Sequence, residues 1–169
     1  MTDVRDLFDT TPTSDAVLSD CGTYRYRLTR TWGEARPACF IMLNPSVADA
    51  TQDDPTIRRC VGFARAWGCG GIVVVNLYAF RATDPKGLRS AACPTIGPDN
   101  DQHIREAVKR SIPVVCAWGV HGERGGRDVA VKGWLRSVGI VPVCLGTTKD
   151  GHPRHPLYVH SQQALEPYP

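Results

Sequence analysis

The stretch that decides the fold runs from residue 38 to residue 46 and reads ACFIMLNPS. Its first six residues are all apolar, a pattern typical of a strand that is buried on both faces of a parallel sheet. Asn44-Pro45 ends this run, because proline lacks the N–H group that a continuing strand ladder requires. The sequence therefore predicts a central strand over 38–43 with polar residues directly after its carboxyl end.

Similar apolar runs recur further along the chain and alternate with helical patterns. They predict strands over three ranges, 72–75, 112–118 and 140–145. Alternation of strands and helices is typical of a parallel sheet with helices on both faces. We therefore expect an α/β fold, a three-layer α/β/α sandwich around a mainly parallel four-stranded central sheet.

Local capping signals predict where the helices begin. A first helix is expected to start at Asp54-Pro55, with Asp54 as its N-cap and Pro55 as its first residue. A second is expected after Asp99 or Asn100, and a third over 124–138. The inner side of this third helix is predicted to carry Val129, Trp134 and Val138.

The N-terminal part of the chain differs from the rest in charge and pattern. Residues 24–28 read YRYRL, an alternation that predicts an N-terminal edge strand with one solvated face. Residues 1–20 hold five Asp and one Arg, a net charge of −4, so the chain total of +3 leaves +7 for the remainder. We expect a flexible acidic leader over 1–20 and a single α/β domain over 21–169.

Composition excludes several classes of protein. No apolar run approaches the roughly 20 residues of a membrane helix, and the first residues lack the pattern of a signal peptide, so we expect a cytoplasmic protein without a membrane partner. The seven cysteines form no CxxC pair and match no common zinc or iron–sulfur spacing. We therefore expect no disulfide framework, no metal and no cofactor. The mildly basic body is compatible with a nucleic acid or a nucleotide as partner without requiring one, and it indicates no oligomeric state.

Polar patches follow the predicted strands at the point where each strand ends. Right-handed crossovers place the carboxyl ends of such strands on one rim, where ligands bind in open α/β sheets. Four patches are expected there: Asn44 to Ser46, Asn76 to Ala79, Trp118-Gly119, and residues 151–156, which read GHPRHP. Asn, His and Arg side chains on one rim predict a site for a polar, anionic ligand.

Each patch also has a structural interpretation. Asn44-Pro45 is a common way to start a turn, and the amide of Asn76 can be satisfied by backbone groups instead of a ligand. Of the carboxylates at 49, 53 and 54, one can cap a helix and the others can be solvated, although paired carboxylates can also divide acid and base roles. The segment around His155 can be a rigid surface loop, but two His flanking an Arg favour contact with an anion.

The assembled residues resemble two families. Across nearly its whole length the chain resembles a bacterial domain family of unknown function (DUF1643-like). The residues that carry this resemblance are Asn44-Pro45-Ser46, Asp54-Pro55-Thr56, Asn76-Leu77-Tyr78, Arg81-Ala82-Thr83-Asp84-Pro85, Gly97-Pro98-Asp99-Asn100-Asp101 and Pro153-Arg154-His155-Pro156. A more distant resemblance is to the uracil-DNA glycosylase superfamily, carried by Asn44-Pro45, Val74 to Leu77, Ala117-Trp118-Gly119 and His155-Pro156.

The second resemblance implies a fold like that of the glycosylases and a set of roles. Asn76 would read the edge of a base, and His155 would stabilise the negative charge on the departing base. Asn44, helped by Asp49 or Asp53, would place water against the sugar carbon. Phosphate would be held by Arg81, His152 and Arg154. The remaining candidates for contact with substrate are Pro45, Ser46, Tyr78 and Trp118.

We therefore expect a glycosylase-like hydrolase that acts on an N-glycosidic bond of a base in DNA, or of a nucleoside or nucleotide. The alternative is a non-catalytic domain that binds a nucleotide or nucleic acid on the same scaffold. A third interpretation is an enzyme of different chemistry, because a shared fold does not fix function.

Overall fold

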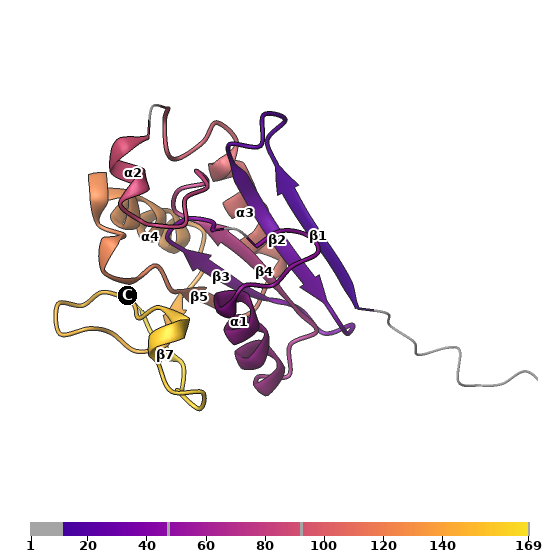
Figure 1. Cartoon of the computed structure of the whole chain (residues 1–169). Coiled ribbons are helices and arrows are strands. Elements are labelled where there is room, and N and C mark those ends of the chain that lie inside the picture. Colours follow the sequence, from indigo (N-terminus) through magenta and orange to yellow (C-terminus); the bar gives the residue numbers. More distant parts are fainter. Residues whose placement is uncertain (1–11, 47, 92, 169) are drawn as a thin grey trace, which may run out of the picture.

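The computed structural model describes residues 12–46, 48–91 and 93–168. Its strands form a seven-stranded mixed sheet in the order β1-β2-β4-β3-β5-β6-β7 (Figure 1). The strands are β1 (Thr13–Leu18), β2 (Arg25–Thr31), β3 (Ala38–Met42), β4 (Gly71–Asn76), β5 (Val114–Cys116), β6 (Val143–Cys144) and β7 (Glu166–Pro167).

The centre of the sheet is parallel, and its two sides are antiparallel. Strand β3 pairs in parallel with β4 and with β5, and β5 pairs in parallel with β6. Strands β1, β2 and β7 are added to this parallel part by antiparallel pairing. The parallel group of four agrees with the predicted central sheet, but the prediction of four strands plus one edge strand was too small.

Two expectations for the N-terminal part were wrong. Strand β2 is not an edge strand, because it lies between β1 and β4. Within the predicted leader, Thr13–Leu18 forms β1, while residues 1–11 lie outside the described residues. Strand β1 was missed because it is mostly exposed and is held by backbone pairing with β2, so its side chains carry little apolar signal.

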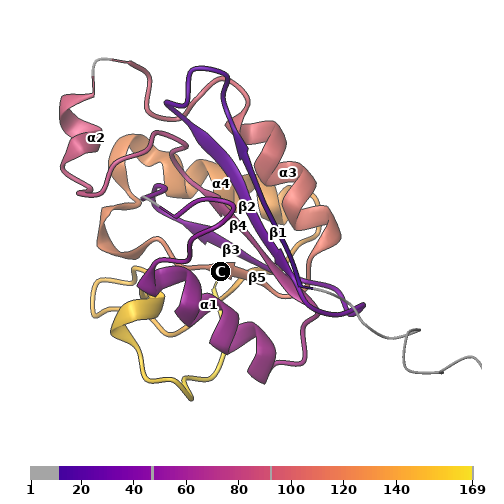
Figure 2. The ribbon, with the colours of Figure 1, turned by 45° about the vertical axis from the view of Figure 1, so that its right-hand side comes forward.

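Helices pack against both faces of the sheet. They are α1 (Pro55–Ala66), α2 (Gly87–Ser90), α3 (Asn100–Arg110) and α4 (Arg127–Ser137). Helix α1 buries Ile57 and Phe63 in one cluster with strand residues such as Phe40. Helices α3 and α4 bury Ile104 and Leu135 in a second cluster with Ile41. Figures 1 and 2 show α1 on one face of the sheet and α3 and α4 on the opposite face.

The helix starts at Pro55 and at Asn100 are confirmed, but the predicted inner side of α4 is wrong. Asp54 caps α1 by accepting a hydrogen bond from the Ile57 N–H at 2.8 Å. On α4, Val129 and Val138 are 64% and 48% exposed. The buried positions are Arg127, Asp128, Val131 and Leu135, of which the first, third and fourth recur every four residues. Of the three predicted residues, only Trp134 packs against the core, where it is partly buried.

Three short 3-10 helices complete the described fold: η2 (Gly119–His121), η3 (Arg124–Gly126) and η4 (Pro156–Tyr158). Strand β5 leads into η2, and η4 follows directly after His155. None of the helices in the described ranges is both long and apolar enough to cross a membrane. Residues at the ends of the parallel strands, together with η2 and η4, line the cavity described below.

Candidate functional site

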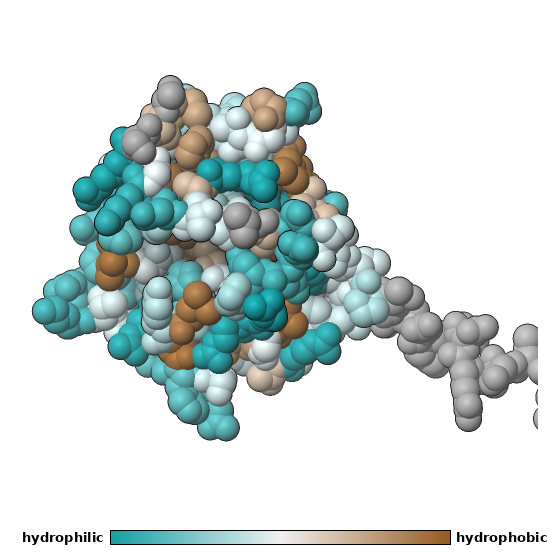
Figure 3. Space-filling view, viewed as in Figure 1, coloured by the Kyte–Doolittle hydropathy of each residue, from teal (hydrophilic) through white to brown (hydrophobic). Residues whose placement is uncertain are grey.

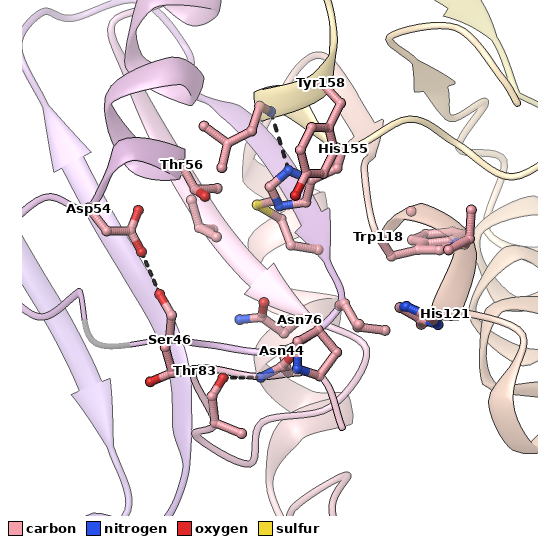
Figure 4. A pocket seen from close by; sticks show the side chains of 18 of the residues that line it. Asn44, Ser46, Asp54, Thr56, Asn76, Thr83, Trp118, His121, His155 and Tyr158 are labelled. Atoms are coloured by element: carbon pink, nitrogen blue, oxygen red, sulfur yellow. Dashed lines mark hydrogen bonds between the residues drawn. The ribbon is translucent and has the colours of Figure 1, made fainter. Parts of the chain in front are cut away.

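A cavity of about 510 Å³ lies where the central parallel strands end. Its walls come from the segments that follow β3, β4 and β5, from the start of α1, and from the segment around η4. Figure 4 shows Asn44, Asn76 and His155 facing a common space from three of these segments. This volume is within the roughly 300–1,000 Å³ of small-molecule sites, so the rim is large enough to enclose a ligand.

Asn76, the last residue of β4, contributes a buried amide to the cavity. Only 1% of the residue is exposed, and its Nδ2 group has no hydrogen-bond partner. The backbone beside it is held by Asn100, whose Nδ2 donates to the carbonyl oxygens of Asn76 and Leu77 at 2.9 and 3.2 Å. An unpaired buried donor is costly, so the Asn76 amide is available to an acceptor on a ligand.

Asn44 and Ser46 follow β3, and their hydrogen bonds connect this part of the cavity wall to the loop after β4 and to the start of α1. The Asn44 Nδ2 group donates to the Ala82 carbonyl at 2.7 Å, which ties the loop after β4 to the end of β3. Ser46 Oγ donates to Asp54 Oδ2 (Figure 4). Asn44 therefore presents its Oδ1 acceptor, while Ser46 is held by the carboxylate that caps α1.

His155 enters the cavity just before η4. The backbone N–H of Leu157 donates to His155 Nδ1 at 3.2 Å, so the neutral imidazole carries its proton on Nε2. Burial lowers the pKa of His155 below its usual value of 6.5, with a smaller opposing effect from the Asp54 charge. His155 is therefore a neutral hydrogen-bond donor at neutral pH.

Arg59 on α1 holds the segment that carries His155. Its Nε group donates to the Pro156 carbonyl at 3.2 Å, and its Nη2 group donates to the Val159 carbonyl. On the other side of the same segment, the Gly119 N–H donates to the Pro153 carbonyl at 2.9 Å. These contacts fix the His155 backbone between α1 and the end of β5.

Arg25, the first residue of β2, is a cavity residue that the sequence pattern did not reveal. Because β2 runs antiparallel to β4, Arg25 lies at the rim where the parallel strands end, and its N–H donates to the Ala79 carbonyl at 2.9 Å. Its Nη1 group donates to the Ala48 carbonyl, and its Nε group is buried without a partner. The alternating pattern of residues 24–28 predicted a solvated arginine, whereas Arg25 is 3% exposed.

Two predicted carboxylates lie elsewhere. Asp53 forms an ion pair with Arg30 at 2.8 Å and lines a second cavity, of about 550 Å³, between β1, β2 and α1. Asp49 closes a local turn by accepting from the N–H groups of Thr51 and Gln52, and these hydrogen bonds with that of the Thr51 hydroxyl lower the pKa of Asp49. Among the described residues, the carboxylate that does line the main cavity, the one of about 510 Å³, is Asp54, which the sequence predicted as a helix cap and considered with Asp49 and Asp53 for an acid or base role.

The remaining candidates divide into two groups. Six predicted residues line the cavity together: Asn44, Ser46, Asn76, Trp118, Arg154 and His155. Six do not, among them Asp49 and Asp53, described above. Pro45 is buried in the turn after β3, and His152 lies 3.9 Å from Glu123. Tyr78 donates to the Arg124 carbonyl, and Arg81 donates to the Gly22 carbonyl.

Sequence reasoning missed several lining residues besides Arg25. These are Thr56, Thr83, His121 and Tyr158, among others, and no spacing rule singled them out because they come from loops and helix ends. The surface seen in Figure 3 is mostly hydrophilic, with single hydrophobic residues between polar ones. In the ranges that the structure describes, no group of three or more His, Cys, Asp or Glu side chains could hold a metal ion.

Comparison with known proteins places the chain in a family. The family described as "Protein of unknown function (DUF1643)" matches residues 25–157, a range that begins at Arg25 and includes His155. Comparison with curated proteins and with solved structures gave no match. Because the match covers more than half of the chain, the protein belongs to the DUF1643 family of proteins of unknown function.

Proposed function

We propose that the protein is a glycosylase-like hydrolase that cleaves the N-glycosidic bond of a base in DNA, or of a nucleoside or nucleotide. The observation that carries this proposal is the pairing of two groups in one cavity. Asn76 offers a buried amide without a partner, and His155 offers a neutral imidazole with its proton on Nε2.

Base recognition is assigned to Asn76. An amide side chain both donates and accepts, so it can pair with a base edge that carries a carbonyl oxygen beside an N–H group. The partner-free Nδ2 group of Asn76 makes this pairing favourable, because a base carbonyl would satisfy a donor that is otherwise unpaired.

The charges that develop in the reaction would be stabilised by two residues that line the cavity, His155 and Asp54. When the bond between the sugar carbon and the base nitrogen breaks, its electron pair goes to the base and positive charge develops on the sugar. His155 Nε2–H would donate to the base as it becomes negative, and the Asp54 carboxylate would favour the positive sugar. Water would then add its oxygen to the sugar carbon, and its proton would end on the released base.

Placement of that water is assigned to Asn44 alone, without help from Asp49 or Asp53. Asp49 and Asp53 do not line the cavity, whereas Asn44 does. Asn44 is held by its contact with the Ala82 carbonyl, so its Oδ1 oxygen has a fixed position from which to accept a hydrogen bond from water.

Helices on both faces of the sheet, together with the order of the residues along the chain, support a likeness to the three-layer uracil-DNA glycosylase fold.

A second candidate is a binding domain that no longer cleaves. It is favoured by one observation: both oxygens of Asp54 already accept hydrogen bonds, from Ser46 and from the Ile57 N–H. A carboxylate that is engaged in this way is a weak acceptor for a proton from water. Such a protein would bind the same ligands through Asn76 and release no base.

The test is a base-release assay on uracil-, hypoxanthine- and modified-base DNA and on a nucleoside panel. It compares wild type with His155→Ala, Asn44→Ala and the matched control His160→Ala. His160 is an exposed histidine that also accepts a backbone N–H, from Gln162 at 3.3 Å, but it does not line the cavity.

The hydrolase proposal predicts release by wild type and by His160→Ala, with losses of about 100-fold or more in the other two variants. Binding of nucleosides without any release would favour the second candidate. Release that survives both His155→Ala and Asn44→Ala would refute the assigned roles.

A further inference from the structure

We infer that Arg25 forms an anion subsite in the main cavity and that the anion is a phosphate group of a nucleotide or of a nucleic-acid strand. The inference rests on the proposed function in so far as it takes this cavity to be the ligand site. It narrows the class of ligand to nucleotides and nucleic-acid strands, because a base or nucleoside alone would leave the subsite empty.

Arg25 differs from the other buried arginines in that no carboxylate pairs with it among the described residues. Arg30 and Arg127 are also less than 10% exposed, and each forms an ion pair, with Asp53 and with Asp101. Arg25 is the most buried of the three at 3% exposed, and within the described residues it has no carboxylate oxygen within ion-pair distance. A buried guanidinium without a counter-ion is costly, and a bound anion would remove that cost.

The second argument is the state of the guanidinium nitrogens. Nη1 donates to the Ala48 carbonyl, which fixes the orientation of the group, while the buried Nε has no partner. Burial lowers the pKa of Arg25 to about 10, so the side chain remains a cation at neutral pH. The cation is held in place with donor capacity left over, as two-point recognition of a phosphate requires.

The third argument is the balance of charge in the cavity. The charged side chains that line it are Arg25, Arg154 and Asp54, which gives a net charge of +1 when both lining histidines are neutral. Beyond the effect of burial, the nearby charges oppose one another: Arg81 and Arg30 lower the pKa of Arg25. The carboxylates Asp54 and Asp49 raise it. Asp54 accepts hydrogen bonds from Ser46 and from the N–H of Ile57, and no ion pair joins it to Arg25 among the described residues.

Hydroxyl groups complete the surroundings of the subsite. Ser46 and Thr56 line the same cavity as Arg25, and Thr56 lies in the first turn of α1. Hydroxyl groups and the start of a helix are common partners of phosphate oxygens. Arg25 and Thr56 therefore present a phosphate with donors from β2 and from α1, whereas the hydroxyl proton of Ser46 is donated to Asp54.

The test measures calorimetric binding of three probes: deoxyuridine, deoxyuridine 5′-monophosphate, and a short single-stranded oligonucleotide with deoxyuridine and no terminal phosphate. It uses wild type, Arg25→Met, Arg25→Lys and the control Arg27→Met. Arg27 belongs to the same strand, lies 3.9 Å from Glu106 and does not line the cavity. Melting temperatures of each variant are recorded with and without inorganic phosphate.

Two of the probes contain phosphate: the monophosphate, and the oligonucleotide through its phosphodiester groups. We expect wild type and Arg27→Met to bind one of these two about 10- to 100-fold more tightly than deoxyuridine. Arg25→Met should lose this preference, and Arg25→Lys should keep part of it. Phosphate should raise the melting temperature of wild type but not that of Arg25→Met. Without phosphate, Arg25→Met should melt at the same or a higher temperature, because it removes an uncompensated buried charge.

Which probe shows the preference assigns the source of the phosphate, a free nucleotide or a strand. Equal binding of all three probes by wild type, or a preference that survives in Arg25→Met, would overturn the inference. If Arg25→Met does not fold, a preference in Arg25→Lys equal to that of wild type together with the absence of a phosphate effect on the wild-type melting temperature would overturn it. An Arg25-dependent preference without base release would refute the hydrolase and leave the phosphate subsite standing.

Discussion

Asn76 and Asn100 illustrate at the residue scale how two buried amides can have opposite roles. Asn100 donates to two backbone carbonyls, so its side chain stabilises the fold. Asn76 has an unpaired Nδ2 group and lines the cavity, so under the proposed function its side chain serves a ligand contact more than the fold. Asn100 also has an unpaired buried atom, its Oδ1, but Asn100 does not line the cavity.

Replacement of these two residues should separate stability from binding. We expect Asn100→Ala to lower the free energy of unfolding by about 1–3 kcal/mol, because it removes a buried donor from the Asn76 and Leu77 carbonyls, of which Leu77 keeps its hydrogen bond from Arg127. Asn76→Ala should change it by less than about 1 kcal/mol and weaken nucleoside binding about tenfold or more. Urea unfolding and calorimetric titration provide the two readouts, and a large loss of stability in Asn76→Ala would contradict the assignment.

The protonation of His155 predicts how activity depends on pH. Under the proposed function the neutral imidazole is the active form. Burial lowers its pKa below 6.5, so base release should be constant from about pH 8 to pH 6.5 and fall at lower pH. A rate that rises as the pH falls would mean that the cation is the active form.

Stability should change in the same direction. In the folded state His155 holds its proton less tightly than in the unfolded state, so the free energy of unfolding should decrease as the pH falls below about 6.5. The pKa of His103 is also lowered by burial, and this residue adds a contribution of the same sign. The difference between wild type and His155→Asn across pH 7 to 5 isolates the part that belongs to His155.

At the scale of single elements, helix starts were predictable because a cap depends on residues that are adjacent in sequence. Asp54 accepts from the Ile57 N–H as expected, and it also holds Ser46. The N-cap of α3, Asp99, makes no side-chain cap hydrogen bond although its sequence signal was similar.

The two caps should therefore differ in their contribution to stability. Asp54→Ala should lower the free energy of unfolding by about 1–2 kcal/mol, and Asp99→Ala should lower it by less than half of that amount. Thermal and urea unfolding of the two variants check this. Equal losses would mean that the Asp54 cap contributes no more than an uncapped helix start.

The position of a strand in the sheet and the buried side of a helix were not predictable in the same way. Residues 24–28 alternate like an edge strand, yet β2 is covered by β1, a strand with few buried side chains. On α4, Arg127 and Asp128 are buried while Val129 is exposed, so hydropathy alone selected the wrong side. Both outcomes depend on which other element packs there, and Arg25 was missed for the same reason.

The whole molecule places its most protected part next to the cavity. Strand β3 is fully buried, is paired on both sides and ends at Asn44. The outer strands are exposed, as β1 is, or only two residues long, as β6 and β7 are. The rim where ligands are expected is therefore supported by the most stable strands, which suits a site with fixed geometry.

Hydrogen exchange should reveal this gradient. Amide protons of β3 and β4 should exchange most slowly, at a rate set by global unfolding, and those of β1, β6 and β7 should exchange faster. Exchange followed by mass spectrometry on peptides from each strand provides the measurement. Slower exchange in β1 than in β3 would contradict this order of stability.

The measurement that tests the central claim most directly is a crystal structure of the protein with deoxyuridine 5′-monophosphate. We expect the base to lie in the main cavity with its edge at the Asn76 amide, His155 Nε2 beside the glycosidic nitrogen, and the phosphate at Arg25. A nucleotide bound with its base away from Asn76 and His155, or bound in the second cavity beside Arg30 and Asp53, would contradict the claim.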